Sequence, residues 1–448
     1  MSTFRFDSGE LMNLLSRARS VTSGASIETE FPIANAYDRD SMSPLIWVDG
    51  EEDCDVIADL ARDTYGEFEG SFTGGIPPGW TSRHEGSGSS AKETSTVASG
   101  SGALKLTTTA DADVAAISRD YEMARGEVGV ARVKLATNND SGSPTIALRL
   151  YDVRARLWYD GDADEWTAAE ADACSVVGVV ASGVFDGGVF DSGTFDEYLG
   201  AASGYQSCEV VFTVPAGQES KTTIRAYLRA TASAGSATRN TYADDFYLQS
   251  AWNAAAWVGH NADQGAPLLL QKSTDGSTWS TVATATHRRP TMYALAEEMQ
   301  TARYARQLVE GVNSEQLRTG EALLLQLRDP AHSWGSTLPV TWRPSQVREQ
   351  GPSGRSHVSD ISEDIPRDVA MSLELIDDDV RAAFRDELAL RSGLGRWPAF
   401  VVPDTAVPDA FYGLISNALT LARGVCSPVE TGTITLSETG FPTVGLGL

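Results

Sequence analysis

The segment QKSTDGSTWSTVAT, residues 271–284, has the pattern of a β-hairpin and indicates a β-sheet domain around it. Asp275 favours a turn, and Gly276 after it tolerates a positive φ without steric cost. Trp279 and Val282, which are apolar residues of high β propensity, follow the turn. The pattern predicts two paired strands, with Trp279 in the core of the domain.

The length and charge of the chain limit its class. Its 448 residues exceed one ordinary hydrophobic core and predict about two to four domains. The net charge of −26 would repel nucleic acid and anionic membrane surfaces, so neither partner is expected. The N-terminus lacks the apolar stretch of a signal peptide, and no run approaches the roughly 18 apolar residues of a membrane span. We therefore expect a soluble chain made in the cytoplasm, without membrane insertion.

Four cysteines are spread along the sequence without the C-x-x-C spacing of a zinc or redox site. Free thiols of small, buried side chains are the expectation for these residues. The alternative is a disulfide between Cys174 and Cys208.

Short alternating segments dominate from about residue 61 to 248, for example VGVARVKLA, TIALRLYDV and TTIRAYLRA. Regularly spaced short strands with polar turns are typical of a β-sandwich or jelly roll. Beyond residue 330, DVAMSLELI predicts a strand and DDDVRAAFRDELALRSGLG (377–395) predicts a helix that Gly393 ends. The predicted fold class is mainly β, with a last region of the α+β type.

Two acidic segments raise the question of calcium, and no other cofactor is predicted. In YDGDADEW, residues Asp160, Asp162 and Asp164 take the first three ligand positions of an EF-hand loop. The sixth position holds glutamate instead of glycine, and the twelfth holds alanine, so a weak metal site and an exposed acidic turn both stay open. In VFDGGVFDSGTFDEY (184–198), three Phe-Asp pairs recur every five residues, either as calcium ligands or as a run of tight turns.

Aromatic residues flank the first of these segments. Trp158, Tyr159 and Trp166 lie beside its carboxylates. Sugar-binding surfaces combine rings, which stack on CH groups, with acids that accept hydrogen bonds from hydroxyls. The three residues are therefore candidate glycan contacts. The alternative is that they complete the edge of a sandwich or a subunit contact.

The sequence contains no GxSxG, HExxH, GxxxxGK[ST] or GxGxxG pattern. Its five histidines are scattered without the spacing of metal ligands. No catalytic residue is predicted, and the chain is not expected to be an enzyme. A glycosidase pair of carboxylates is the enzymatic alternative, since the chain has 61 acidic residues.

The order of several motifs resembles the discoidin-like, galactose-binding-like β-sandwich of tail and tail-fibre proteins of tailed bacteriophages. In that family an Asn-Ala-x-Asp segment and a tryptophan open the domain, a His-Asn turn follows a core strand, and an Asp-Gly-x-x-Trp hairpin precedes an Ala-Arg-Tyr strand. The matching residues here are Asn35, Ala36, Asp38, Trp47, His260, Asn261, Asp275, Gly276, Trp279, Ala302, Arg303 and Tyr304. The resemblance implies that the hairpin at 271–284 is scaffold.

Further segments extend the resemblance. GSFTGGIPPGW and YADDFYL look like the two ends of a carbohydrate-binding jelly-roll module that is inserted into the sandwich. VTWRPSQ, WPAFVVPD and FYGLI resemble the C-terminal domain of phage minor tail proteins. The predicted boundaries are a split discoidin-like sandwich at 1–60 and 253–329, an inserted jelly roll at 61–252, and an α+β docking domain at 330–448.

The resemblance implies a structural component of a tailed-phage virion, most simply at the tail tip or baseplate, that acts by assembly. Other tail proteins would be its partners, and copies of the chain would form a ring that is put together in the host cytoplasm. The alternative is an adhesin or fibre-type virion protein whose inserted module binds host surface glycan. A polysaccharide-degrading enzyme with a binding module is the third hypothesis, and placement in the capsid instead of the tail also stays open.

Overall fold

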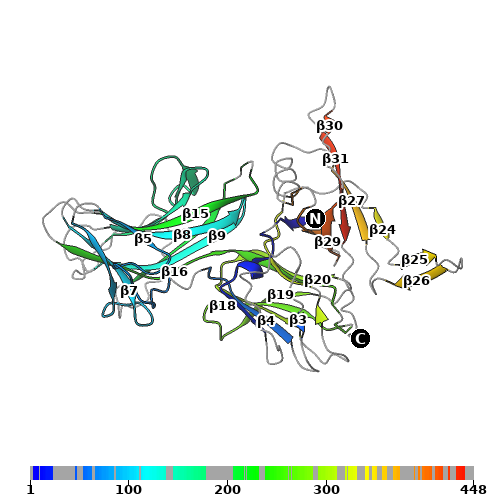
Figure 1. Cartoon of the computed structure of the whole chain (residues 1–448), viewed down its shortest axis with the longest axis horizontal. Coiled ribbons are helices and arrows are strands. Elements are labelled where there is room, and N and C mark those ends of the chain that lie inside the picture. Colours follow the sequence, from blue (N-terminus) through cyan, green and yellow to red (C-terminus); the bar gives the residue numbers. More distant parts are fainter. Residues whose placement is uncertain are drawn as a thin grey trace, which may run out of the picture.

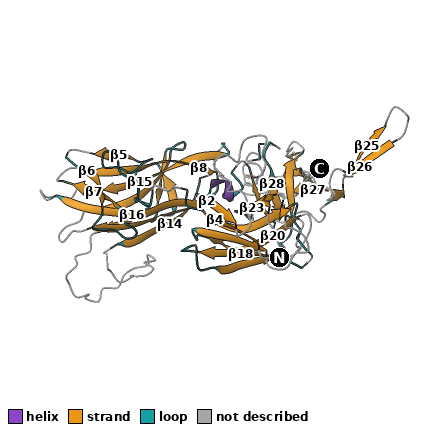
Figure 2. Cartoon of the chain, turned by 60° about the horizontal axis from the view of Figure 1, so that its bottom comes forward, coloured by secondary structure: helices purple, strands orange, loops and turns teal. Residues whose placement is uncertain are grey.

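Strands make up nearly all the regular structure of the chain (Figure 2), which confirms the mainly-β fold class. The computed structural model describes residues 4–9, 11–23, 46–47, 54–62, 66–84, 87–109, 113–137, 145–177, 205–215, 217, 219–231, 238–260, 262–263, 265–285, 291–309, 318–319, 321–329, 339–342, 346–350, 356–360, 367–373, 388, 392–393, 396–405, 409–416, 422–423 and 430–438.

The segment between residues 66 and 250 forms a jelly roll of two antiparallel sheets, on the left of Figure 1. The first, here the β10 sheet, has the order β12-β11-β10-β15-β8-β5 with β13 paired to β10: β5 (Thr81–His84), β8 (Val114–Ala124), β10 (Thr145–Asp152), β11 (Leu157–Asp160), β12 (Glu165–Thr167), β13 (Cys174–Val177) and β15 (Lys221–Ala230). The second, the β9 sheet, has the order β14-β9-β16-β7-β6: β6 (Ser89–Glu93), β7 (Ala103–Thr108), β9 (Val128–Thr137), β14 (Gln206–Thr213) and β16 (Arg239–Ser250).

The jelly roll buries its apolar residues between these two sheets. In β10, β14 and β15, alternate residues face inward, as the period of two in TIALRLYDV and TTIRAYLRA predicts. Three aromatic rings close one part of the core: the Trp80 ring lies 5.2 Å from the Phe246 ring and 5.6 Å from the Phe68 ring, both edge to face. The jelly roll therefore has one contiguous apolar core of its own.

A smaller β-sandwich lies beside the jelly roll and uses residues from both sides of it in the sequence. The β18 sheet has the order β19-β18-β21-β4-β2: β2 (Ser20–Ser23), β4 (Cys54–Asp59), β18 (Leu268–Ser273), β19 (Ser280–Ala285) and β21 (Tyr304–Val309). The β17 sheet has the order β20-β17-β23: β17 (Trp252–Val258), β20 (Thr291–Gln300) and β23 (Glu321–Leu325). In Figure 1 the blue β4 lies close to the green β18. Whether these units fold separately at the predicted boundaries stays a prediction.

The predicted hairpin at 271–284 is present as β18 and β19, and Gly276 in its turn has a φ of 74°. The expectation that Trp279 lies in the core is wrong. Its ring is only half-buried, with the Arg306 guanidinium 5.9 Å from the ring centroid. The reason is position, because β19 is the edge strand of its sheet and Trp279 lies at the turn end of that strand.

The C-terminal region forms a third unit around the β28 sheet, which has the order β1-β28-β29-β31-β27-β24 with β30 paired to β31. Its strands are β1 (Arg5–Ser8), β24 (Val340–Trp342), β27 (Arg367–Leu373), β28 (Ala399–Val402), β29 (Phe411–Ile415), β30 (Ala422–Arg423) and β31 (Glu430–Glu438). Strand β1, at the N mark in Figure 1, pairs with β28, although the sequence analysis assigns residues 1–60 to the sandwich. Phe4 and Phe6 fill the core of this sheet together with residues such as Phe411.

Strand β17 is buried on both faces and joins the last two units. Ala255 and Trp257 face the β18 sheet, whereas Ala254 and Ala256 face Phe400 and its neighbours in the β28 sheet. A strand with apolar neighbours on both sides needs an almost continuous apolar sequence, which explains the run WNAAAWV. The sandwich and the C-terminal sheet therefore stack as three layers.

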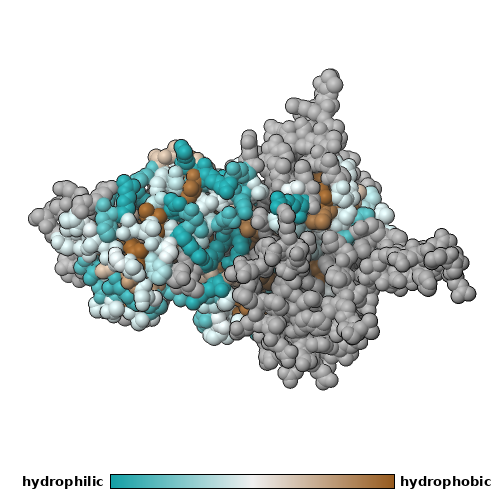
Figure 3. Space-filling view, viewed as in Figure 1, coloured by the Kyte–Doolittle hydropathy of each residue, from teal (hydrophilic) through white to brown (hydrophobic). Residues whose placement is uncertain are grey.

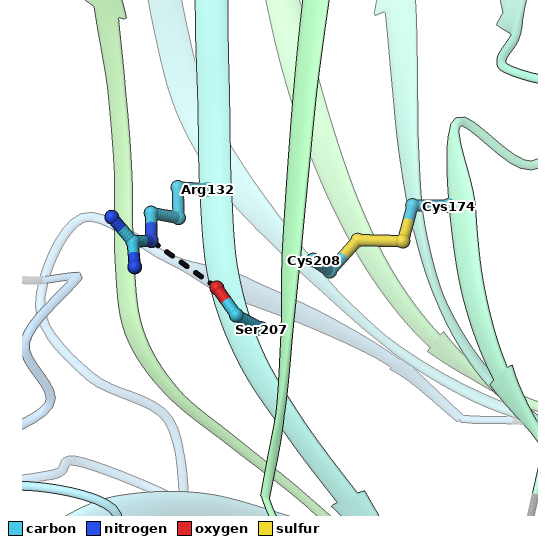
Figure 4. The surroundings of a disulfide bond; sticks show 4 residues. All are labelled: Arg132, Cys174, Ser207 and Cys208. Carbon is cyan, nitrogen blue, oxygen red and sulfur yellow. Dashed lines mark hydrogen bonds between the residues drawn. A yellow bond between two sulfur atoms is a disulfide. The ribbon is translucent and has the colours of Figure 1, made fainter. Parts of the chain in front are cut away.

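A disulfide joins the two sheets of the jelly roll (Figure 4). It links Cys174 on β13 to Cys208 on β14, which are 34 residues apart in the sequence and 6.2 Å apart between Cα atoms. The expectation of free thiols is wrong for these two residues, because the facing sheets bring them within the range of a disulfide. For Cys54 and Cys426 it stays a prediction.

A buried charge cluster fixes the jelly roll to the sandwich. The Glu127 carboxylate, in the turn before β9, accepts hydrogen bonds from Arg17 Nη1 and Arg62 Nη2, each at 3.0 Å, and from the Ser250 hydroxyl. Burial and the charge of Arg17 lower the pKa of Arg62 to about 9. Burial alone would raise the pKa of Glu127, but Arg17 and Arg62 outweigh it and hold that pKa at about 2.

The remaining elements are small: the 3₁₀ helix η1 (Leu14–Arg17), the pair β3 (Ile46–Trp47) and β22 (Arg318–Thr319), and the hairpin β25 (Gln346–Gln350) and β26 (Ser356–Asp360). Several predicted features lie outside the described residues, namely the Phe-Asp repeat at 184–198, the motif residues 35–38 and most of the helix at 377–395. Gly393, the expected end of that helix, has a φ of 61°.

Candidate functional site

The hairpin β11–β12 carries the six candidate metal and glycan contacts of the segment LWYDGDADEW, namely Trp158, Tyr159, Asp160, Asp162, Asp164 and Trp166. Its register pairs Trp158 with Thr167 and Tyr159 with Trp166. Because successive side chains of a strand point to opposite faces, Tyr159 and Trp166 share one face and Trp158 lies on the other. The structure therefore divides the predicted aromatic group into two parts.

Tyr159 and Trp166 face the interior of the jelly roll. Their rings lie 5.4 Å apart, and both contact the Phe212 ring, at 5.9 and 6.0 Å. Trp166 Nε1 donates a hydrogen bond of 2.7 Å to the Thr213 carbonyl. Burial and then the Asp164 carboxylate, which pairs with the phenol, raise the pKa of Tyr159 above its usual value. These two rings therefore complete the edge of the jelly roll, in agreement with the alternative interpretation of a sheet edge.

The three aspartates of this hairpin serve its own turn. Asp160 Oδ1 accepts hydrogen bonds from the backbone N–H groups of Asp162 and Ala163, at 3.0 and 3.2 Å. Asp164 adopts a positive φ of 54° and directs a carboxylate oxygen to the Tyr159 hydroxyl. Among the described residues, no three acidic, cysteine or histidine side chains are placed to hold a metal ion. The geometry gives no support to the calcium site proposed at Asp160, Asp162 and Asp164.

Trp158 belongs to a cluster of three rings on the outer face of the β10 sheet. Its ring centroid lies 4.6 Å from that of Tyr151 on β10 and 5.1 Å from that of Tyr227 on β15, and the two tyrosine rings are 6.4 Å apart. All three side chains are half-buried. We call them the aromatic triad. Rings from three adjacent strands thus form one partly exposed apolar surface.

A buried aspartate positions the chain between two of these rings. Asp152 follows Tyr151 and accepts hydrogen bonds from Arg125 Nη1 at 2.5 Å and from the Thr222 hydroxyl at 2.6 Å. Its other contacts are to the backbone N–H groups of Arg154 and Ala155, at 3.0 and 2.9 Å. The carboxylate therefore holds the turn that leads from β10 to Trp158 on β11.

Three arginines, here the paired arginines, surround the triad on the same face. The strand register places Arg149 beside Tyr227 and Arg225 beside Tyr151, with Arg229 two residues beyond Tyr227. Each is bound to carboxylates: Arg149 Nε to Asp172 at 2.5 Å, Arg149 Nη1 and Arg229 Nη1 to Glu170 at 2.9 and 2.8 Å, Arg225 Nε to Asp120 at 2.7 Å, and Arg229 Nε to Asp113 at 3.2 Å. We call the four acids the partner carboxylates.

This arrangement offers apolar ring surface, N–H donors and carboxylate acceptors on one sheet face. Each guanidinium has five N–H donors, of which the partner carboxylates occupy some, and each carboxylate has spare lone pairs. Figure 3 shows that the described part of the jelly-roll surface in this view is largely hydrophilic, with small apolar patches. Such a face suits a ligand with apolar CH groups and many hydroxyls.

No protein-family model matches the chain, and no curated protein matches its sequence. Solved structures to which part of the chain is similar include the CBM22-1 xylan-binding domain of Paenibacillus barcinonensis Xyn10C, with 12% identity, a TM-score of 0.24, and coverage of 42% of this chain and 92% of that one. The C-terminal family 22 carbohydrate-binding module of Clostridium thermocellum Xyn10B has 15% identity and a TM-score of 0.24, over 43% and 95% of the two chains. The K2 cleaved adhesin domain of Lys-gingipain has 17% identity and a TM-score of 0.25, over 41% and 96%. These values are too low to assign a function.

Tyr151 and Tyr227 are the members of the triad that the sequence analysis misses. The alternation of two strands could have predicted that both tyrosines face outward. Leu148 and Leu150 face the core, so Tyr151 points to the other face of β10. Ala226 and Leu228 likewise face the core, so Tyr227 points outward from β15. Alternation within one strand does not predict which other strand lies next to it, so it cannot bring Tyr151 and Tyr227 together.

No helix in the described part of the chain is long and apolar enough to span a membrane.

Proposed function

We propose that this chain is a carbohydrate-binding protein that acts by binding and not by catalysis. The observation that carries the proposal is the aromatic triad on the outer face of the β10 sheet, with the paired arginines around it. Sugar rings present CH groups that pack on aromatic faces, and their hydroxyls bond to charged side chains. A shallow, polar site of this kind binds with a Kd of roughly micromolar to millimolar.

The test is binding of the full chain to a glycan array, followed by titration of the best glycan. Replacing Trp158 with alanine should weaken binding roughly tenfold or more, since aromatic anchors carry much of the energy of such contacts. Trp279→Ala is the matched control, because that ring is also half-buried but lies on the sandwich. Unchanged binding by a folded Trp158→Ala variant contradicts the proposal.

We also propose a second function, a structural role in the tail tip or baseplate of a tailed-phage virion, which the sequence resemblance implies. One observation favours it. Trp342 on β24, the last strand in the order of the β28 sheet, is 61% exposed, and the Arg367 guanidinium lies 5.6 Å from its ring. An exposed tryptophan on an edge strand is a suitable anchor for a neighbouring subunit, either a second copy in a ring or another tail protein.

Mass spectrometry of purified phage particles tests this second role, because a structural component must be present in them. In addition, Trp342→Ser should lower incorporation into particles without lowering the melting temperature of the purified chain. Absence of the protein from particles, or normal incorporation of the Trp342→Ser variant, counts against assembly through β24.

A further inference from the structure

The charges around the aromatic triad nearly cancel. The three paired arginines contact four partner carboxylates, and every one of these arginines has a carboxylate oxygen within 3.2 Å. Glu170 bridges two of them, Arg149 and Arg229. The group therefore carries a small negative charge in total, and the whole chain carries −26.

These pairs decide what an incoming glycan gains. A guanidinium that already pairs with a carboxylate attracts the carboxylate or sulfate of an acidic glycan only weakly, and displacing the partner carboxylate would replace one ion pair with another. The partner carboxylates also repel such a ligand, and so does the acidic chain around them. An uncharged hydroxyl is not repelled, and it uses the guanidinium N–H groups and carboxylate lone pairs that are left.

We infer that this face takes uncharged glycans and discriminates against glycans that carry uronic acid or sulfate groups. The inference rests on the proposed carbohydrate-binding function and adds the class of ligand. The paired arginines then act in specificity: they are hydrogen-bond donors held in place by the partner carboxylates, and their positive charge is already neutralised within the sheet.

Polysaccharide pairs that share a backbone and differ chiefly in charge test the inference on the full chain: hydroxyethyl and carboxymethyl cellulose, methyl-esterified and free polygalacturonate, dextran and dextran sulfate. In calorimetric titrations we expect binding to at least one neutral member, with its charged counterpart at least roughly tenfold weaker. Binding of the neutral member should change less than about twofold between about 0.02 and 0.5 M NaCl, because no ion pair forms with the ligand.

Removing a partner carboxylate should reverse part of the discrimination. Asp120→Asn removes the negative charge that pairs with Arg225 at 2.7 Å, so the affinity for the charged polysaccharide should rise roughly two- to fivefold, while the affinity for the neutral one changes little. Glu209→Gln is the control, because it removes the same charge from the β9 sheet, where Glu209 lies 3.6 Å from Arg132.

The outcomes separate the two proposals. Equal or tighter binding of a charged member that Trp158→Ala abolishes overturns the selectivity and leaves the glycan-binding function intact. Absence of binding to all six polysaccharides and to the glycan array overturns the function and the selectivity together. An unchanged response of Asp120→Asn to the charged member contradicts the role given to the partner carboxylates.

Discussion

Glu127 keeps a negative charge in a place from which water is excluded, and two arginines from another unit of the chain make this tolerable. Breaking a buried ion pair from one side leaves the other charge without a partner. Glu127→Gln should therefore lower the free energy of unfolding at pH 7 by about 3 kcal/mol. Chemical denaturation of both proteins measures this. Glu122→Gln is the control, since Glu122 forms an exposed pair with Lys221.

The same residue gives a pH dependence with a definite sign. The pKa of folded Glu127 is about 2, below its ordinary value of 4.5, so the stabilisation is complete above pH 4.5 and is lost as the pH falls toward 2. The stability difference between the natural chain and Glu127→Gln should shrink over this window. The range from about pH 5 to about pH 2.5 covers most of this titration. A stability difference that stays constant across it would show that the charge of Glu127 does not stabilise the fold.

Two tryptophans of the sandwich should respond very differently to truncation. The Trp257 ring is fully buried and its Nε1 donates a 2.8 Å hydrogen bond to Gln307, whereas Trp279 is half-buried at an edge. We expect Trp257→Ala to cost about 3–5 kcal/mol and Trp279→Ala about 1 kcal/mol or less. Thermal unfolding compares the two variants directly. Equal costs would mean that burial does not set them apart.

Strand β1 pairs with a part of the chain that is distant in the sequence. Phe6 exchanges backbone hydrogen bonds with Arg328, at 3.1 and 2.9 Å, and β1 covers the edge of β28. Deleting residues 1–9 should expose that edge and remove Phe4 and Phe6 from the core. Hydrogen exchange at β28 should then become faster, with little change in β10. Arg5→Ala, which removes only a partly exposed ion pair with Asp329, is the control.

The disulfide between β13 and β14 restrains the unfolded chain. It closes a loop across a sequence separation of 34 residues, for which a stabilisation of about 2–4 kcal/mol is typical. A Cys174→Ser, Cys208→Ser double variant should be less stable by that amount in urea. Dithiothreitol should lower the stability of the natural chain equally and leave the double variant unchanged. An effect of the reductant on the double variant would point to another cause.

Strand patterns in the sequence predict elements well and their neighbours poorly. Alternation locates β10, β15 and the hairpin β18–β19, because burial of one face imposes a period of two. The β11–β12 hairpin shows the limit: Trp158, Tyr159 and Trp166 are close in sequence, but the pleat sends Trp158 to the opposite face. Its true neighbours, Tyr151 and Tyr227, come from strand pairing that local sequence does not record.

For the whole molecule, the way in which the chain enters and leaves the jelly roll matters. Arg62 N donates a 3.2 Å hydrogen bond to the Leu248 carbonyl, so entry and exit lie side by side. Replacing residues 63–249 with a short Gly/Ser linker should leave a cooperatively folding protein. The replaced segment includes Glu127 and the surface that covers Arg17 and Arg62. Both arginines then become exposed to water, so neither charge is buried without a partner. Size-exclusion chromatography and thermal unfolding test this, and an aggregated product contradicts it.

The pairing of β1 with β28 is the part of the C-terminal sheet that could not be predicted from the sequence. Strand β1 has four residues, and its partner β28 lies near the other end of the chain. Nothing within RFDS marks that pairing, since a short segment of this kind suits any open sheet edge. The burial of Phe4 and Phe6 is explained only by their contacts with residues of the β28 sheet that lie far along the sequence, such as Val401 and Phe411.

The place of β1 sets an order on biosynthesis. The Ser8 hydroxyl bonds to the Leu388 carbonyl, 380 residues further along, so β1 leaves the ribosome long before the residues that it contacts in the β28 sheet. At about 5–20 residues per second, Phe4 and Phe6 wait roughly 20 to 80 seconds while the jelly roll, the whole sandwich and strands β24 and β27 are synthesised. During that time the nascent chain carries an unpaired apolar segment, which makes it a substrate for chaperones that bind hydrophobic segments near the ribosome.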